Sequence, residues 1–409
     1  MRIKAFINLI VVVLLGITLS SCSESESGQF TRKNKLENTL TPDVPQSPDA
    51  PQSNDEKIPE DDLSLSESES PPDALNKAPH PKYTIAFLGH FSVLDEKLYT
   101  LSSNAHNGVP VEVRTFNFNV IDIVSAEKPD SLYCILESDK GRFLAKVNIE
   151  TGFVSHLTKN INYLSHLTIS DNHSVLGYIS KSSNGVQALH IYDIKSKALK
   201  SFNTQVAVND FTFSHDGTKV YYTLNKKNSW LTYEVMWNAK PLKWKQLEEN
   251  KNGKTVKNFK ILDSGKNIIY LDSNIKGQQI HLWDATTKKR ILLYQGNQLH
   301  ELALSPDEKY LVFFEQTVDG QFLKLLNLNT RFVENIDNIL VPLKNEDGFI
   351  PSRVHPVWTP DSMSFFYGSF DGRYGSIYKY DLEAKEITRL TDSIYTDFYH
   401  PIVLEGQVP

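Results

Sequence analysis

Short runs of alternating apolar and polar residues recur along most of this chain. Five copies share one pattern: a polar residue, two apolar positions with one residue between them, a turn, and a longer apolar run. They read HLTISDNHSVLGYIS, DFTFSHDGTKVYYT, NFKILDSGKNIIYL, ELALSPDEKYLVFF and HPVWTPDSMSFFYG, starting at His166, Asp210, Asn258, Glu301 and His355. Successive copies start 44, 48, 43 and 54 residues apart. A period in the forties made only of short strands predicts an all-β protein, a β-propeller of four-stranded antiparallel blades.

Two weaker copies complete the count. One starts near Val120 and reads VIDIVSAEKPDSLYCILES. The other, in residues 83–119, shows only three strands, whereas residues 397–404 at the opposite end read as one isolated inner strand. We expect this C-terminal strand to join the N-terminal blade, because ring closure removes unpaired edges. That arrangement gives seven blades, and a different pairing of residues 83–119 gives six or eight.

The blade motifs resemble those of the TolB-like propeller family. SPDEKYLVFF and TPDSMSFFYGSFDGRYGSIYKYDLEAKEITRLT match its Ser-Pro-Asp-Gly turn and its outer hairpin, and SHDGTKVYY matches with His215 in place of Pro. The resemblance covers residues 120–404 well. The resemblance implies the propeller fold. It does not identify one function, since the family includes envelope scaffold proteins and similar propellers accompany hydrolase domains.

The N-terminus is typical of a bacterial lipoprotein signal. Residues 1–22 begin with Arg2 and Lys4, continue with a short apolar stretch, and end in Leu-Ser-Ser-Cys. By this resemblance Cys22 would carry the lipid and become the first residue after cleavage; the alternative is an ordinary cleavable signal. Ser23 is similar to lipoproteins sorted to the outer membrane of Gram-negative cells. We therefore expect a cell-envelope location with a membrane anchor, facing the periplasm or the cell surface.

Residues 23–82 differ in composition from residues 83–409. They hold nine prolines and thirteen acidic against six basic residues, so we expect a disordered tether, either a passive spacer or a segment that recruits a partner. The propeller region, residues 83–409, holds 35 basic and 36 acidic residues. This balance argues against nucleic-acid binding, which needs a basic surface.

The two cysteines exclude a disulfide framework. Lipidation would use Cys22, and Cys134 lies in an apolar run, LYCILES, where we expect it to pack as a small hydrophobic side chain.

One set of polar residues is the candidate binding site. The first residue of each strong copy, together with the closing strand, gives His166, Asp210, Asn258, Glu301, His355 and His400, and Arg353 and Tyr399 lie next to two of the histidines. Equivalent positions in a propeller surround its axis, so these residues are expected to ring one mouth of a central tunnel. Polar strand starts beside a water-filled channel are also common without any ligand. Adjacent residues such as Glu301, His355 and His400 could share an ion, whereas opposite blades lie too far apart.

The chain contains none of the sequence motifs of common hydrolases, metalloproteases or phosphate-binding loops. We therefore assign no catalytic residue, metal site or cofactor. The favoured function is a membrane-anchored, non-enzymatic envelope protein whose propeller binds a protein partner. Alternatives are a sensor that binds a small ligand, peptide or glycan, and a metal-dependent lactonase or lyase. Fold by itself does not choose between them.

Overall fold

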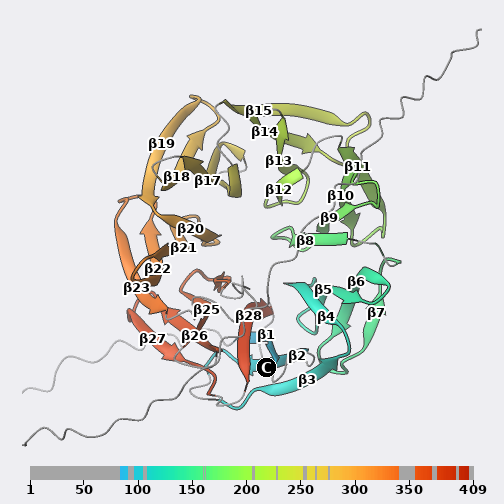
Figure 1. Cartoon of the computed structure of the whole chain (residues 1–409), viewed down its shortest axis with the longest axis vertical. Helices are drawn as coiled ribbons and strands as arrows, with labels where there is room; N and C mark the ends of the chain where they lie inside the picture. Colours follow the sequence, from blue (N-terminus) through green and yellow to red (C-terminus); the bar gives the residue numbers. More distant parts are fainter. Residues whose placement is uncertain are drawn as a thin grey trace, which may run out of the picture. The chain divides into compact units, whose positions relative to one another are not determined.

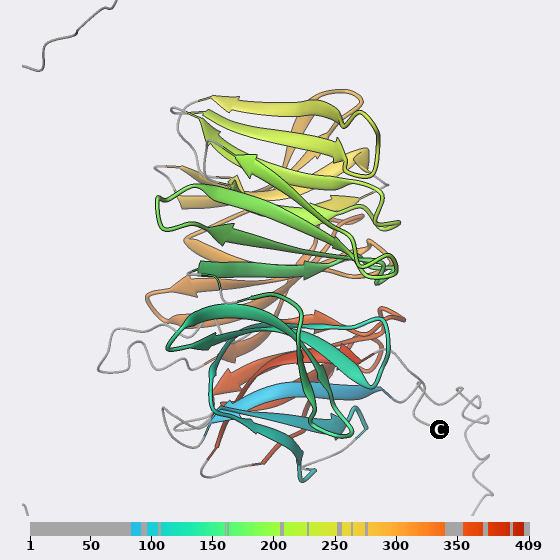
Figure 2. The same ribbon diagram turned by 90° about the vertical axis from the view of Figure 1, so that its right-hand side faces the viewer.

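The computed structural model describes residues 83–90, 96–104, 108–159, 161, 163–204, 208–226, 229–251, 256–262, 265–274, 277–339, 355–370, 375–392 and 396–404. In these ranges the chain forms 28 strands in seven four-stranded antiparallel sheets. The sheets stand around one axis as the blades of a propeller (Figure 1), and Figure 2 shows the same ring from its side. The predicted count of seven blades is confirmed.

Each blade runs from an inner strand near the axis to an outer strand at the rim. In that order, blade 1 consists of β28 (Asp397–Leu404), β1 (Thr84–His90), β2 (Glu96–Ser102) and β3 (Val111–Phe116). Blade 2 consists of β4 (Asn119–Ser125), β5 (Ser131–Ser138), β6 (Gly141–Asn148) and β7 (Val154–His156). Blade 3 consists of β8 (Tyr163–Ile169), β9 (Val175–Lys181), β10 (Gln187–Asp193) and β11 (Leu199–Thr204).

Four further blades follow in the same order. Blade 4 consists of β12 (Val208–Phe213), β13 (Val220–Lys226), β14 (Ser229–Met236) and β15 (Lys243–Lys251). Blade 5 consists of β16 (Val256–Leu262), β17 (Asn267–Asn274), β18 (Gly277–Asp284) and β19 (Lys289–Gly296). Blade 6 consists of β20 (Gln298–Leu304), β21 (Tyr310–Thr317), β22 (Gly320–Asn327) and β23 (Val333–Ile339). Blade 7 consists of β24 (Val357–Trp358), β25 (Ser364–Phe370), β26 (Gly375–Asp381) and β27 (Glu386–Arg389).

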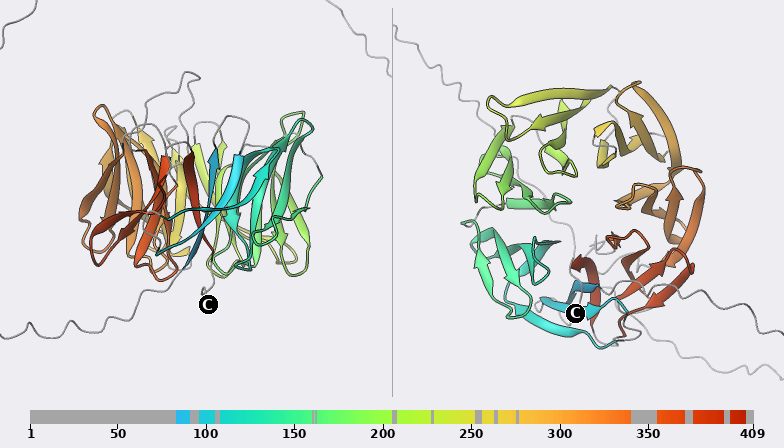
Figure 3. Two further views of the ribbon diagram at one scale, coloured as in Figure 1. Left: turned by 90° about the horizontal axis from the view of Figure 1, so that it is seen from below. Right: turned by 180° about the vertical axis from the view of Figure 1, so that it is seen from behind.

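The ring is closed by the C-terminal strand, as the sequence predicted. β28 pairs antiparallel with β1, from Thr84 opposite Leu404 to His90 opposite Asp397. The first and last described strands of the chain are thus neighbours in one sheet, as both views of Figure 3 show.

The hydrophobic core is divided among the boundaries between blades. Seven clusters of buried side chains occur in the described residues, and each draws its members from two neighbouring blades. A blade is therefore covered on both faces, which explains why second strands such as β5, with six consecutive buried residues, contain an unbroken apolar run, here residues 132–136. Cys134 lies in β5 with no exposed surface, as expected for a small hydrophobic residue, and burial raises the pKa of its thiol.

The turn after each inner strand explains the Ser-Pro-Asp-Gly pattern. In blade 6 the Tyr310 N–H donates to the Ser305 hydroxyl at 2.9 Å, and that hydroxyl donates to the Asp307 carboxylate at 2.6 Å. The position that favours glycine has a left-handed backbone, with φ of 67° at Gly217 and 57° at Glu308. The side chains thus satisfy the turn backbone, and the repeat spacing follows from this local geometry.

Candidate functional site

The polar position of the repeat occurs in all seven blades. In blade 2 the Ala126 N–H donates to the Ser131 carbonyl, just as the Ser170 N–H donates to Val175 in blade 3. Counting four residues back from Ala126 gives Asp122, which the sequence comparison missed because the Val120 copy is weak. The full set, which we call the axial ring, is Asp122, His166, Asp210, Asn258, Glu301, His355 and His400.

A β-bulge presents four of the axial-ring side chains, and in β4 and β12 the register shift falls one residue earlier, next to Asp122 and Asp210. The pairing register shifts by one residue in β8, β16, β20 and β28, each time at the axial-ring position. There the backbone is left-handed, with φ of 55° at His166, 52° at Asn258, 55° at Glu301 and 52° at His400. Bulges of this kind re-aim one side chain out of the regular pleat.

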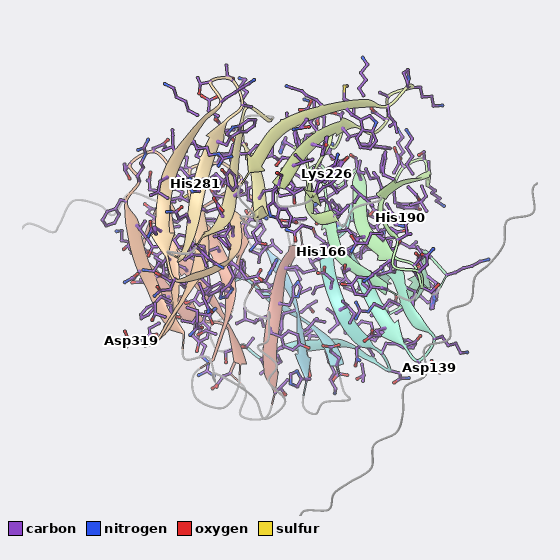
Figure 4. All side chains as sticks on the ribbon, turned by 45° about the horizontal axis from the view of Figure 1, so that its top comes forward. Asp139, His166, His190, Lys226, His281 and Asp319 are labelled. Carbon is purple, nitrogen blue, oxygen red and sulfur yellow. The ribbon has the colours of Figure 1, made fainter. Side chains whose placement is uncertain are left out.

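The axial ring lies inside the propeller instead of at its mouth. His166 has three residues of β8 on either side of it, and His400 also stands in the middle of β28. Figure 4 shows His166 close to the axis, whereas His190 and His281 lie farther out in their blades. The expectation that these residues sit at the ends of the inner strands is therefore corrected for those that lie within strands, whereas His355 precedes β24.

Four axial-ring residues from consecutive blades form a connected series. Glu301 of blade 6 makes an ion pair with Nδ1 of His355 in blade 7. The His355 ring stacks on His400 of blade 1, with centroids 5.2 Å apart and planes at 29°. His400 Nε2 lies 3.8 Å from Oδ1 of Asp122 in blade 2. The series thus links blades 6 and 7 to blade 2 through His400 of blade 1, the blade that closes the ring.

Two aspartates of the axial ring join neighbouring blades. The Leu167 N–H of blade 3 donates to Asp122 Oδ2 at 2.9 Å, and the Phe259 N–H of blade 5 donates to Asp210 Oδ2 at 3.3 Å. Each carboxylate accepts from the residue that follows the axial-ring position of the next blade. The bulge at that position leaves the N–H without a ladder partner, so these contacts satisfy buried backbone donors.

Burial and neighbouring charges shift the pKa values of the residues in this series in different directions. Burial by itself would raise the pKa of Glu301, but the charge and hydrogen bond of His355 hold it at about 2. The negative charge of Glu301 in turn raises the pKa of His355, against burial. Burial raises the pKa of Asp122 to about 6, partly offset by the Leu167 N–H and by His355. Near neutral pH, Glu301 and His355 therefore exist as an ion pair.

Solvent reaches one member of this series more than the others. The His355 side chain is 52% exposed, compared with 16% for His400 and 19% for Glu301. His355 thus keeps an exposed surface beside its contacts with Glu301 and His400. It is the group of this series best placed to contact a molecule entering along the axis.

The other residues that the sequence suggested for the site do not join this connected series. Tyr399 does not belong to the site: it is 3% exposed, packs in the core between blades 1 and 2, and donates its hydroxyl to Glu96. Its side chain stays in the regular pleat of β28 and packs toward blade 2, whereas the bulge at His400 turns the next side chain out of that pleat. His166 Nδ1 lies 3.0 Å from the Ser165 hydroxyl. Arg353 lies outside the described residues.

Lys260 of β16 is a further charged residue near the axial ring. Burial raises the pKa of Asp210 and the charge of Glu301 raises the pKa of His355, and the positive charge of Lys260 opposes both shifts. No sequence signal distinguished it from the other lysines of its region. In the part of the chain that the structure describes, no three His, Cys, Asp or Glu side chains are arranged to hold a metal ion. The described residues also include no helix long and apolar enough to cross a membrane.

The shifted pKa values predict how stability depends on pH. Asp122 has a folded pKa of about 6 against the usual 3.8, so its protonated form favours folding and that contribution is lost as pH rises from about 4 to 6. His355 has a raised pKa, so its contribution is present below about 6.5 and is lost as pH rises through the folded value. Urea unfolding between pH 4 and 9 should show both declines.

Two substitutions separate these declines. Asp122→Asn should remove the decline in the free energy of unfolding between pH 4 and 6. This decline is on the order of 2–3 kcal/mol, at 1.36 kcal/mol per pKa unit. His355→Gln should remove the decline in stability above pH 6.5 and leave the decline between pH 4 and 6. His215→Gln, whose side chain is 81% exposed in a turn, is the control and should change neither. Unchanged profiles for the first two variants would contradict the assignment.

Comparisons with known proteins support the fold. No family model and no curated protein matches the chain. Among solved structures, a putative 6-phosphogluconolactonase from Bacteroides fragilis NCTC 9343 has 13% identity and a TM-score of 0.53, covering 80% of this chain and 99% of that one. An oligogalacturonate lyase in complex with manganese has 9% identity and a TM-score of 0.52, covering 76% and 85%. TolB from Acinetobacter baumannii has 13% identity and a TM-score of 0.48, covering 79% and 67%.

At these identities the likeness to the lactonase and to the lyase shows the fold alone. The fold and the site together define a seven-bladed β-propeller with a ring of polar and titratable side chains around its axis.

Proposed function

We propose that this chain is a non-enzymatic binding protein of the cell envelope, anchored by lipid at Cys22, whose propeller holds a protein partner. The observation that carries the proposal is the series from Glu301 through His355 and His400 to Asp122. It places fixed hydrogen-bonding groups from four blades beside the axis, around the half-exposed His355.

The contacts of the axial ring favour binding over catalysis. Asp122 and Asp210 accept hydrogen bonds from backbone N–H groups of neighbouring blades, and Glu301 is paired with His355. These carboxylates maintain the ring, whereas a general base must be able to exchange a proton with its substrate. A partner segment entering along the axis would meet the His355 imidazolium as a donor for a carbonyl or carboxylate oxygen.

The sequence outside the propeller supports the proposed location. Residues 1–22 carry the lipoprotein signal pattern, Ser23 is similar to proteins sorted to the outer membrane, and residues 23–82 give the propeller a long acidic tether. A flexible chain of this length spans roughly 40–45 Å. A propeller held in this way could reach a partner well above the membrane surface.

The test is a crosslink and pull-down from intact envelopes. Wild type should retain a specific protein partner, and His355→Ala/His400→Ala should lose it. The control is His156→Ala, because His156 is an exposed residue on the outer strand β7. The thermal unfolding midpoint of each variant is measured as well, and the pull-down is done at a temperature where all of them are folded, so that loss of the partner reports binding.

Other outcomes would redirect the assignment. A partner that the double variant retains would place binding away from the axial ring. Absence of any protein partner would contradict the scaffold role and favour a small ligand or an ion. Calorimetric titration with Mn²⁺ and with oligosaccharides would then distinguish the binding and lyase alternatives.

A further inference from the structure

Six lysines lie on the outer rim of blades 3 and 4, and we call them the basic rim. They belong to the outer strands β11 and β15 and to the turns before them: Lys195, Lys197, Lys200, Lys240, Lys243 and Lys245. All are exposed except Lys200, which is half-buried. None of the six forms an ion pair with another described residue, whereas Lys219 of blade 4 is paired with Glu234 at 3.2 Å.

Contacts between the two blades bring these lysines onto one surface. β11 and β15 are the outermost strands of adjacent blades (Figure 1), and the turns before them are on the same face of the propeller. The Lys200 ammonium of β11 donates to the Trp237 carbonyl, at the start of the blade 4 turn, and lies 5.5 Å from the centroid of the Trp237 ring. Trp244 of β15 meets the Phe202 ring of β11 edge-on at 5.8 Å. The basic rim therefore crosses the boundary between blades 3 and 4.

Large apolar side chains are exposed among these lysines. Leu199 is 50% exposed, Leu242 36% and Trp244 48%, and residues 241–246 are exposed without interruption. Trp244 differs in this from the other four tryptophans, which are at most 7% exposed. Single exposed apolar residues are common, but a group of them surrounded by polar residues marks an interaction surface.

The chemistry of this surface matches the headgroup layer of an anionic membrane. Lysines are attracted to lipid phosphates, and tryptophan places its apolar ring and its N–H at the boundary between headgroups and acyl chains. The next acidic residues of β15, Glu248 and Glu249, begin about 10 Å farther along the strand, toward the opposite face. The surface faces outward from the ring, which suits a broad, flat partner. The signal pattern of residues 1–22 also predicts a membrane near the chain.

We propose that the basic rim and Trp244 dock the propeller on the anionic headgroups of a membrane. The lysines pair with lipid phosphates, while Trp244 and Leu242 enter the boundary with the acyl chains. Because the basic rim belongs to the outer strands, docking leaves the axial ring open to a partner. The inference rests on the exposed residues of the rim, and it requires neither the protein partner nor a lipid at Cys22.

Quenching of Trp244 fluorescence by brominated lipids tests the proposal on the full chain. Vesicles consist of phosphatidylcholine alone or of an equal mixture with phosphatidylglycerol, with bromine on the acyl chains close to the glycerol. Membrane binding by the N-terminal apolar stretch is common to both, so the local quenching at Trp244 is the informative signal. We expect quenching in the mixed vesicles only. It should be lost at about 1 M NaCl, where the screening length falls to about 3 Å, and in Trp244→Phe.

Matched lysine substitutions then locate the contact. Lys243→Gln/Lys245→Gln should raise the concentration of mixed vesicles needed for half-maximal quenching about tenfold or more. Lys181→Gln/Lys226→Gln is the control, because these exposed lysines end the second strands of the same blades, at the opposite face. This pair should leave the quenching unchanged.

Three outcomes would overturn the docking proposal. Trp244 that stays unquenched in mixed vesicles at low salt would assign the basic rim to an acidic protein surface instead of a lipid. Equal quenching in both kinds of vesicle would show that anionic headgroups are not recognised. Equal effects of the two lysine pairs would show that docking is not located at the basic rim. Each of these leaves the pull-down at the axial ring as an independent result.

Discussion

Removal of the closing strand β28 is expected to unfold the entire propeller. A chain ending at residue 396 loses the inner strand of blade 1 and leaves the edge of β1 unpaired. β28 also contributes five apolar side chains that are at most 7% exposed: Phe398, Tyr399, Ile402, Val403 and Leu404. Burial of each contributes about 1.5–3 kcal/mol, so their sum is comparable with the about 5–15 kcal/mol that stabilises a typical domain.

Thermal unfolding followed by circular dichroism measures this effect. A chain ending at residue 404 is the control, since it keeps all of β28, and its unfolding midpoint should equal that of the full chain. Phe398→Ala is an intermediate case. The Phe398 ring packs edge-on against Phe87 at 5.3 Å and Tyr99 at 5.2 Å, so its loss should cost about 3–5 kcal/mol. A normal midpoint for the chain ending at residue 396 would show that ring closure does not depend on β28.

Substitution of Cys22 is expected to release the protein from the membrane. If Cys22 carries the lipid, Cys22→Ala has no acyl chains, and each buried CH₂ contributes about 0.8 kcal/mol to membrane binding. Because two or more chains anchor stably and none does not, the change should be close to complete. Fractionation after a high-salt wash, with metabolic fatty-acid labelling, measures both location and acylation.

The second cysteine provides the matched control for this experiment. Cys134 is fully buried in blade 2, so Cys134→Ala should remain acylated and in the membrane fraction. If Cys22→Ala still pellets with membranes, the anchor lies elsewhere and the lipoprotein part of the proposal fails. A soluble wild type without fatty-acid label would also refute it.

The propeller was predictable because its information is local and repeated. Each Ser-Pro-Asp or Ser-His-Asp turn fixes one tight connection, and each copy supplies the same alternation of apolar residues. The closing strand was also visible in the sequence, because an isolated inner strand at one end matched a blade with three strands at the other. Local turn chemistry and apolar period therefore determined blade count and closure.

The candidate site was only partly predictable. His166, Asp210, Asn258, Glu301 and His355 were found because they precede recognisable turns by four residues, and His400 was found because FYHPIVL resembles RVHPVWT, 45 residues earlier. Asp122 occupies the same position, but its turn, AEKPDS, departs from the pattern and hid it. Tyr399 was included for its position next to His400, but it packs in the core between blades 1 and 2, because only His400 lies on the bulge of β28.

The sequence by itself determined an all-β propeller of seven blades, its closure by residues 397–404, and a recurring polar position on the inner strands. Only the tertiary structure decided that a bulge lies at or next to this position in six of the seven inner strands, and that Glu301, His355, His400 and Asp122 connect across four blades. The physical reason is that turns and apolar periodicity act over a few residues. Bulge register and contacts between blades depend instead on how separate strands pack around the axis.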